Sequence, residues 1–325
     1  MTRAAAIGCG VIGAGWIARL RLNGIDVCAH DLSPAALDVI SDVHDNALQA
    51  WRELNLEPAP EAIGALTMCA SIPAAVADAD FIVESVPERL DIKHAALLAI
   101  DEASIPTAII ASSTSGFKPS VLAEPLTHPA RLLIGHPFNP VYLIPLVEVV
   151  GGVDTDADLI ERAIGLYRSL GMHPLLVRAE IDAHIADRLL EAVWREALWL
   201  VNDGIATTEE IDDAIRYGFG LRWAQMGMFE TNRIAGGLGG MHHFLGQFGE
   251  CLSWPWSKLT DVPELTDDLI DTIATQSDEQ SGHLEVRQLE RIRDRNVAAM
   301  LLALEQNDWG AGKTISDMRQ RRALS

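Results

Sequence analysis

The chain has 325 residues, of which 49% are hydrophobic and 22% charged, and its formal net charge is −21 at pH 7. This length suits two domains with separate cores. The negative charge argues against nucleic acid as a partner, because nucleic-acid binding needs Lys and Arg to displace counterions. No uncharged apolar run reaches the roughly 18 residues of a membrane span, and four scattered cysteines without CxxC spacing suit a reducing cytoplasm.

The first predicted elements are a short apolar strand, residues 4–7, a glycine-rich turn and a helix. The turn has a GxGxxG pattern, and the acid Asp31 ends the next predicted strand, residues 25–30. This order of strand, glycine turn, helix and strand-end acid is typical of a dinucleotide-binding fold, in which the pyrophosphate rests on the helix N-terminus. The expected cofactor-binding residues of the turn are Gly8, Gly10, Val11, Ile12 and Gly13.

Asp31 predicts which dinucleotide binds. Its carboxylate can accept hydrogen bonds from the adenosine ribose and would repel a 2′-phosphate, so NAD is favoured over NADP. Further strands predicted at residues 66–70, 80–86 and 108–113 alternate with helical segments. This alternation predicts a doubly wound, mainly parallel sheet of the Rossmann type.

Residues 132–150, LLIGHPFNPVYLIPLVEVV, read as two apolar strands joined by a tight loop. The second strand carries one acid, Glu148, whose burial is costly without a partner. His136 ends the first strand, and if the strands lie side by side the two side chains meet. A carboxylate on one ring nitrogen makes the other nitrogen a general base. Taken alone, such a pair is more often structural than catalytic.

The positions of other polar residues favour the catalytic interpretation. Asp31, Glu88, Ser115 and His136 each follow the end of a predicted strand. Ligands of doubly wound sheets bind beyond the carboxyl ends of the strands. We therefore expect these residues to converge on one edge of the sheet.

Six segments resemble the 3-hydroxyacyl-CoA dehydrogenase family, in the same order and over nearly the whole chain. They are GCGVIGAGW, ESVPERLDIK, SSTSGF, GHPFNPVYLIPLVEVV, EIDAHIADRLLEA and MGMFE. The resemblance implies that His136 is the general base and Glu148 its orienting partner. It implies that Ser115 and Asn139 hold the substrate oxygen and the nicotinamide end.

The same resemblance assigns cofactor-side positions and an assembly. Glu88 and Lys93 match cofactor-binding positions, and Ser113 stands where the family usually has asparagine. The family further suggests a homodimer formed through the helical half. Strand signals end near residue 181, so we predict a Rossmann domain over residues 1–180 and an all-helical substrate and dimerisation domain over residues 181–325.

One departure from the family pattern concerns the substrate. Asp187 replaces the usual asparagine and brings a negative charge that a CoA thioester does not need. Acids and aromatic side chains together suit a quaternary ammonium group through cation–π attraction, although aromatic clusters on helices usually form a core or an interface. The expected substrate is therefore a quaternary-ammonium 3-hydroxy acid, and its expected contacts include Asp187, Arg188, Trp194, Trp223 and Phe229.

Several alternatives stay open at the sequence level. Arg188, Arg195 and Arg222 are equivalent candidates for the substrate carboxylate. L-Gulonate and 3-hydroxybutyryl-CoA are the alternative substrates within the family, and a structural protein without turnover is the non-enzymatic alternative. We expect no metal site, since His242 and His243 have no further ligand at suitable spacing.

Overall fold

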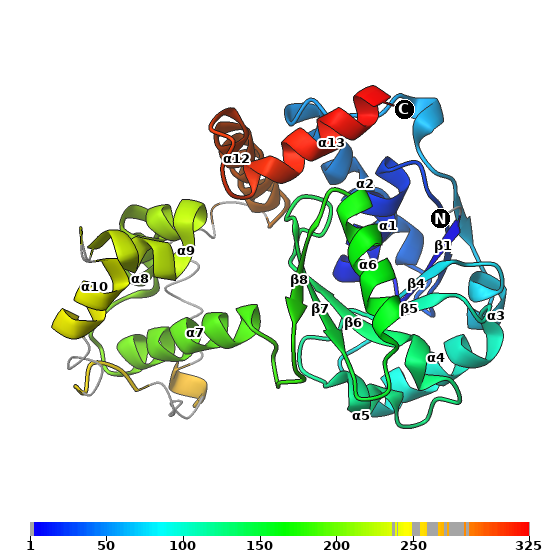
Figure 1. Cartoon of the computed structure of the whole chain (residues 1–325), viewed down its shortest axis with the longest axis horizontal. Coiled ribbons are helices and arrows are strands. Elements are labelled where there is room, and N and C mark those ends of the chain that lie inside the picture. Colours follow the sequence, from blue (N-terminus) through cyan, green and yellow to red (C-terminus); the bar gives the residue numbers. More distant parts are fainter. Residues whose placement is uncertain are drawn as a thin grey trace. The chain divides into compact units, whose positions relative to one another are not determined.

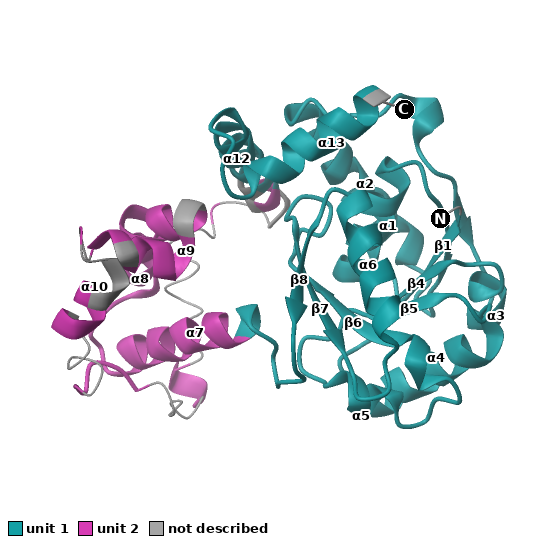
Figure 2. Ribbon diagram, viewed as in Figure 1, with its two compact units in different colours: residues 1–187, 291–325 teal, residues 188–290 magenta. Residues whose placement is uncertain are grey.

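The computed structural model describes residues 3–235, 238, 240–248, 254–258, 266–269, 272, 283 and 286–324. The chain divides into two compact units (Figure 2). Unit 1 comprises residues 1–187 and 291–325, and unit 2 comprises residues 188–290. The domain boundary expected at residue 181 stays a prediction.

Unit 1 contains an eight-stranded sheet with the order β3-β2-β1-β4-β5-β6-β7-β8 (Figure 1). The first six strands of the chain run parallel, β7 is antiparallel to β6, and β8 is parallel to β7. The strands are β1 (Arg3–Ile7), β2 (Asp26–His30), β3 (Leu66–Met68), β4 (Phe81–Glu84), β5 (Ile109–Ser112), β6 (Leu132–Pro137), β7 (Leu146–Gly151) and β8 (His173–Val177). The predicted Rossmann-type, mainly parallel sheet is confirmed.

Helices cover both faces of this sheet, because successive strand side chains point to opposite faces. On β1, Ala4 and Ala6 pack in one buried cluster, and Ala5 and Ile7 in another. The first cluster includes residues of α1 (Val11–Leu22), α2 (Ala36–Glu53) and α6 (Ala157–Ser169). The second includes residues of α3 (Ile72–Val76), α4 (Leu90–Ala103) and α5 (Pro119–Ala123). Short 3₁₀ turns, η1 (Pro60–Ala62) and η2 (Pro129–Arg131), lie in the connections.

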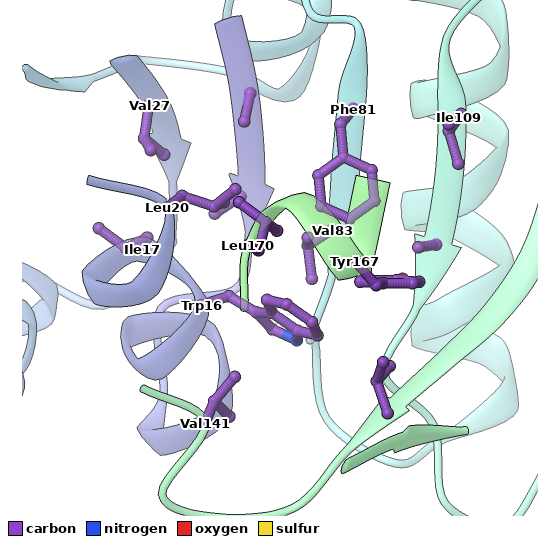
Figure 3. Close-up of a cluster of buried hydrophobic side chains, with 14 of the residues drawn as sticks. Trp16, Ile17, Leu20, Val27, Phe81, Val83, Ile109, Val141, Tyr167 and Leu170 are labelled. Atoms are coloured by element: carbon purple, nitrogen blue, oxygen red, sulfur yellow. The ribbon is translucent and has the colours of Figure 1, made fainter. Parts of the chain in front are cut away.

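Three aromatic rings form the centre of the first cluster (Figure 3). Trp16 of α1 lies 5.7 Å from Tyr167 of α6 and 6.4 Å from Phe81 of β4, measured between ring centroids. The Trp16 indole N–H donates to Ser113 Oγ, 3.1 Å away. The core therefore fixes the chain directly after β5, where several predicted site residues lie.

Most of α12 (Val286–Gln306) and all of α13 (Gly312–Leu324) belong to unit 1. Leu301 and Ile315 pack in one buried cluster with Trp51 of α2. The Trp51 indole N–H donates to the Tyr142 carbonyl, 2.8 Å away, and the Tyr142 hydroxyl donates to Asp294 of α12. These contacts attach the end of the chain to the sheet domain and to the loop between β6 and β7.

The regular elements described in unit 2 are all helices, as predicted for the second half. It contains most of α7 (Ala186–Asn202), α8 (Thr208–Ala214), the π-helical turn η3 (Ile215–Phe219), α9 (Gly220–Ala235) and α10 (Gly240–Phe248). A capping box between Thr207 and Glu210 starts α8. Among the described residues, no helix is long and apolar enough to cross a membrane, and no group of His, Cys, Asp and Glu could hold a metal ion.

Candidate active site

His136 and Glu148 lie opposite each other on the antiparallel strands β6 and β7. Opposite residues of such a pair project from the same face of the sheet. His136 Nδ1 lies 3.0 Å from Glu148 Oε2, and the two residues are 4% and 0% exposed. The predicted contact is therefore present, and it supplies the partner that a buried acid needs. The catalytic roles of the two residues remain predictions.

The second oxygen of Glu148 is bound by the start of α7. Oε1 accepts hydrogen bonds from the amides of Ile185 and Ala186, at 2.9 and 3.0 Å. Burial alone would raise the pKa of Glu148, but the hydrogen bonds from His136, Ala186 and Ile185 outweigh it and keep this pKa below its usual range. Because an ionised Glu148 can only accept a hydrogen bond, Nδ1 of His136 carries the proton, and in the neutral ring Nε2 carries the lone pair.

Two polar side chains border this nitrogen. Ser115 Oγ lies 3.0 Å from His136 Nε2, and Asp187 Oδ2 lies 3.6 Å from it. Ser115 is exposed, and Asp187 in the first turn of α7 is partly exposed. Nε2 is thus the ring nitrogen of His136 that faces Ser115 and Asp187, whereas Nδ1 faces the buried Glu148.

Asn139 lies on the loop between β6 and β7, three residues beyond His136. It is exposed, and its peptide bond with Pro140 is cis. Its predicted role, holding the substrate oxygen, stays a prediction.

Lys93 is almost completely buried, at 1% exposed. Its Nζ lies 2.9 Å from Glu84 Oε1 and 3.2 Å from Glu88 Oε2. The second oxygen of Glu84 accepts from the hydroxyl of Ser112. Sequence reasoning missed Glu84, although it offered a signal similar to that of Glu148, an acid that follows directly on apolar strand residues.

Glu88 connects this network to the loop that carries Ser115. Its Oε1 accepts from the Thr114 hydroxyl and from the Gly116 amide, 2.9 Å away. Burial would raise the pKa of Glu88, but the hydrogen bonds from Thr114, Gly116 and Lys93 keep it below its usual range. Glu88 and Lys93 therefore orient residues 114–116, and a direct contact of either with the cofactor stays a prediction.

The glycine turn between β1 and α1 fits a dinucleotide. Gly8 has φ +89°, and a β-carbon on Gly13 would lie 1.9 Å from the Gly8 carbonyl oxygen. A β-carbon on Gly10 would meet nothing within 4 Å, so the chain is open where a pyrophosphate approaches. The helix begins at Val11 without a side-chain cap, which leaves its first amides available to an anion.

Asp31 follows β2 and lies beside this turn. Its Oδ2 accepts from the Cys9 amide and its Oδ1 from the Ser33 amide, both at 2.6 Å. Burial and the Asp31 carboxylate raise the pKa of the Cys9 thiol to about 12, so this thiol stays protonated. Ser113, directly after β5, accepts hydrogen bonds through its hydroxyl from the Trp16 indole N–H and from Ser85 Oγ, each 3.1 Å away.

His184 is the second site residue that sequence reasoning missed. It is 0% exposed, and its ring centroid lies 5.3 Å from that of His136. Its Nε2 lies 3.2 Å from the Thr114 carbonyl oxygen. No periodicity or spacing in the sequence distinguishes this histidine from its neighbours.

The other predicted substrate residues belong to unit 2 and are described within it. Arg188 is exposed at the start of α7, and Trp194 on the same helix is 53% exposed. Trp223 of α9 lies 4.5 Å from Phe219 between ring centroids, and Phe229 is 77% exposed. Their contact with substrate stays a prediction.

Comparison with known families matches both parts of the chain. Residues 3–181 match the family described as 3-hydroxyacyl-CoA dehydrogenase, NAD binding domain. Residues 184–275 match the family described as 3-hydroxyacyl-CoA dehydrogenase, C-terminal domain. The NAD cofactor predicted from the glycine turn and Asp31 agrees with the first match.

Two curated relatives are similar over nearly the whole chain. The L-carnitine dehydrogenase/betainyl-CoA thioesterase of Agrobacterium fabrum is 59% identical over 98% of this chain, and the chain spans 64% of that protein. The L-carnitine dehydrogenase of Mesorhizobium japonicum is 55% identical over 99% of this chain and 90% of its own length.

A solved structure shares the fold. The NAD⁺-dependent 5-formyl-3-hydroxy-2-methylpyridine 4-carboxylic acid 5-dehydrogenase is 26% identical to the chain. The alignment has a TM-score of 0.78 and covers 94% of this chain and 99% of that one.

Proposed function

The chain belongs to the 3-hydroxyacyl-CoA dehydrogenase family, and we propose that it oxidises the 3-hydroxyl of L-carnitine to the ketone of 3-dehydrocarnitine with NAD⁺. The observation that carries this proposal is the 55% identity to an L-carnitine dehydrogenase over 99% of the chain. The site on β6 and β7 supports the chemistry.

His136 acts as the general base in this proposal. Its Nε2 takes the proton of the substrate hydroxyl, which Ser115 and Asn139 orient, and bound NAD⁺ supplies the acceptor for the hydride of C3. Glu148, hydrogen-bonded to Nδ1, stabilises the imidazolium that forms. The amides of Ile185 and Ala186, at the start of α7, donate to Glu148 Oε1 and keep that carboxylate ionised and fixed.

The position of Asp187 supports a cationic substrate. In L-carnitine the carbon that bears the trimethylammonium is bonded directly to the carbinol carbon. A hydroxyl within reach of Nε2 therefore brings the cation close to any group beside that nitrogen, and Asp187 Oδ2 lies 3.6 Å from it. A carboxylate there favours an ammonium group and disfavours an anion.

The remaining contacts of the proposal come from unit 2. Trp194, Trp223 and Phe229 would hold the methyl groups of the ammonium through cation–π attraction, worth about 0.5–2 kcal/mol for each contact. Arg188 would pair with the substrate carboxylate, with Arg195 and Arg222 as alternatives.

The rival substrates differ in charge. L-Gulonate carries no cation, and 3-hydroxybutyryl-CoA carries phosphates, so neither gains from Asp187. We also propose a homodimer in the cytoplasm, which sedimentation and cell fractionation would test.

A charge-deletion experiment tests the substrate. The neutral isostere 3-hydroxy-5,5-dimethylhexanoate replaces the ammonium nitrogen of carnitine by carbon. We expect kcat/KM for L-carnitine to exceed that for the isostere by at least about tenfold in the wild type, or about 1.4 kcal/mol. In Asp187→Asn this ratio should shrink, and the ratio cancels any effect of the variant on His136 itself. Equal kcat/KM for both compounds in the wild type would contradict the proposal.

A further inference from the structure

The turn before α7 contains a histidine that the proposed chemistry does not use. His184 is completely buried, and its backbone φ is +51°, next to Ala183 at +60°. Two consecutive residues with β-carbons therefore adopt the left-handed region, which is unfavourable for them. Such a conformation persists where the surrounding contacts determine it.

Residues 183–187 contact three parts of the candidate site in unit 1, namely Glu148, His136 and the loop after β5. The amides of Ile185 and Ala186 donate to Glu148, and Asp187 lies beside His136 Nε2. The ring of His184 reaches the third part, the loop after β5, because its Nε2 lies 3.2 Å from the Thr114 carbonyl oxygen. Thr114 directly precedes Ser115.

The hydrogen bond to Thr114 fixes the tautomer of His184. A carbonyl oxygen only accepts, so Nε2 carries the proton and Nδ1 carries a lone pair. No described residue makes a hydrogen bond with that Nδ1. Burial lowers the pKa of His184 and His136 lowers it further, whereas the Thr114 carbonyl, Glu148 and Asp187 oppose this change, and the net direction is downward.

We propose that His184 is a positioning residue, a neutral imidazole that donates to the Thr114 carbonyl and thereby holds the Ser115 hydroxyl at Nε2 of His136. This inference rests on the proposed function, in which Nε2 is the base. Glu88 anchors the same loop through the Thr114 hydroxyl, so the loop is held from two directions. A neutral ring is required there, because the neighbouring His136 becomes a cation when it takes the substrate proton.

Three substitutions separate hydrogen-bond donation from packing. His184→Gln keeps an N–H that can reach Thr114, and His184→Phe keeps a ring without a donor. His184→Asn suits the left-handed backbone but is too short to reach Thr114. We expect His184→Gln to retain kcat within about threefold. We expect His184→Phe and His184→Asn to lower kcat about tenfold at unchanged KM, as for a small displacement of a reacting group. Wild-type kcat in both Phe and Asn variants, or equal losses in all three, would overturn the inference.

Histidine ring ¹⁵N NMR tests the tautomer without turnover. The signals of His184 are those missing from the spectrum of the folded His184→Gln variant. We expect the neutral ring to be protonated on Nε2, and we expect the ring to take up its second proton only below the usual histidine midpoint of 6.5. A neutral ring protonated on Nδ1, or a ring that is mostly cationic at pH 6.5, would contradict the inference. If this result holds while the wild type fails to oxidise L-carnitine, the proposed substrate is wrong and the role of His184 stands.

Discussion

Two buried acid–base pairs, Lys93–Glu84 and His136–Glu148, lie near the carboxyl ends of the parallel strands. They differ in whether the nitrogen atoms of the base still have a hydrogen-bonding position available to a ligand. Lys93 and Glu84 connect α4 to β4. Every proton of the Lys93 ammonium has a protein acceptor, namely Glu84 Oε1 at 2.9 Å and Val86 O and Glu88 Oε2 at 3.2 Å. An ammonium with all three donors used holds the protein together.

His136 and Glu148 connect β6 to β7 and use only one ring nitrogen for that contact. The other nitrogen faces the exposed hydroxyl of Ser115 and the carboxylate of Asp187. Burial of a charged pair therefore does not identify a base. The proposed assignment of His136 as the base depends instead on a ring nitrogen that keeps a lone pair beside exposed polar groups. We expect the first pair to govern stability and the second to govern turnover.

Substitution of His136 should have the largest effect on turnover. His136→Gln keeps a donor for Glu148 but removes the base, so kcat should fall by about 10²–10⁴. The Kd for NAD⁺ and the free energy of unfolding should change little, which calorimetry and urea denaturation measure. Turnover close to that of the wild type would refute the assignment of the base.

Substitution of Lys93 should mainly affect stability. Lys93→Met leaves the buried Glu84 without its counterion, and we expect a loss of about 3–5 kcal/mol in the free energy of unfolding. The double variant Lys93→Met with Glu84→Gln is the matched control, because it removes the uncompensated charge and should recover most of the loss. Equal stability of the single variant and the wild type would contradict the structural role of the pair.

Glu148→Gln should weaken the base without removing it. The amide oxygen can still accept from Nδ1, but it no longer stabilises the imidazolium by charge. A loss of about 10- to 100-fold in kcat is expected, with the acid limb of the pH profile of kcat/KM moved to lower pH. An unchanged pH profile would show that Glu148 does not tune the base.

The smallest expected effect concerns pH and stability. The folded pKa of His184 lies below its usual value of 6.5, so the unfolded chain binds the proton first as the pH falls. The neutral ring therefore contributes its full stability above about pH 6.5. This contribution is lost as the pH falls from there through the folded pKa, by at most about 1.4 kcal/mol per pH unit.

Urea unfolding between about pH 5 and about pH 8 measures this dependence. His184→Gln should reduce the slope below pH 6.5. His44→Gln is a control for a second histidine whose pKa is also lowered, by burial and then by Arg21. A slope that does not change in His184→Gln would show that folding does not lower the pKa of His184.

The sequence predicted the features that local patterns encode. The β6–β7 pair, the glycine turn and the strand-end position of Asp31 each depend on residues close in the chain or on a repeated period. The catalytic roles, the substrate contacts in unit 2 and the domain boundary remain predictions.

Other contacts depend on distant parts of the chain and had no local signal. Tyr142 and Asp294 are 152 residues apart, and periodicity predicts a helix near Asp294 without indicating what it packs on. His184 reaches Thr114 across 70 residues through a turn with positive φ angles that no glycine marks. Side-chain pairing between separate strands and helices therefore needed the structure.

The most direct test is NADH formation by the purified wild-type chain with NAD⁺ and, separately, L-carnitine, D-carnitine, L-gulonate and 3-hydroxybutyryl-CoA. The proposed function predicts turnover with L-carnitine at a kcat/KM far above that of the other compounds. Turnover with only L-gulonate or the CoA ester would keep the His136–Glu148 chemistry and contradict the proposed role of Asp187 in binding a cation.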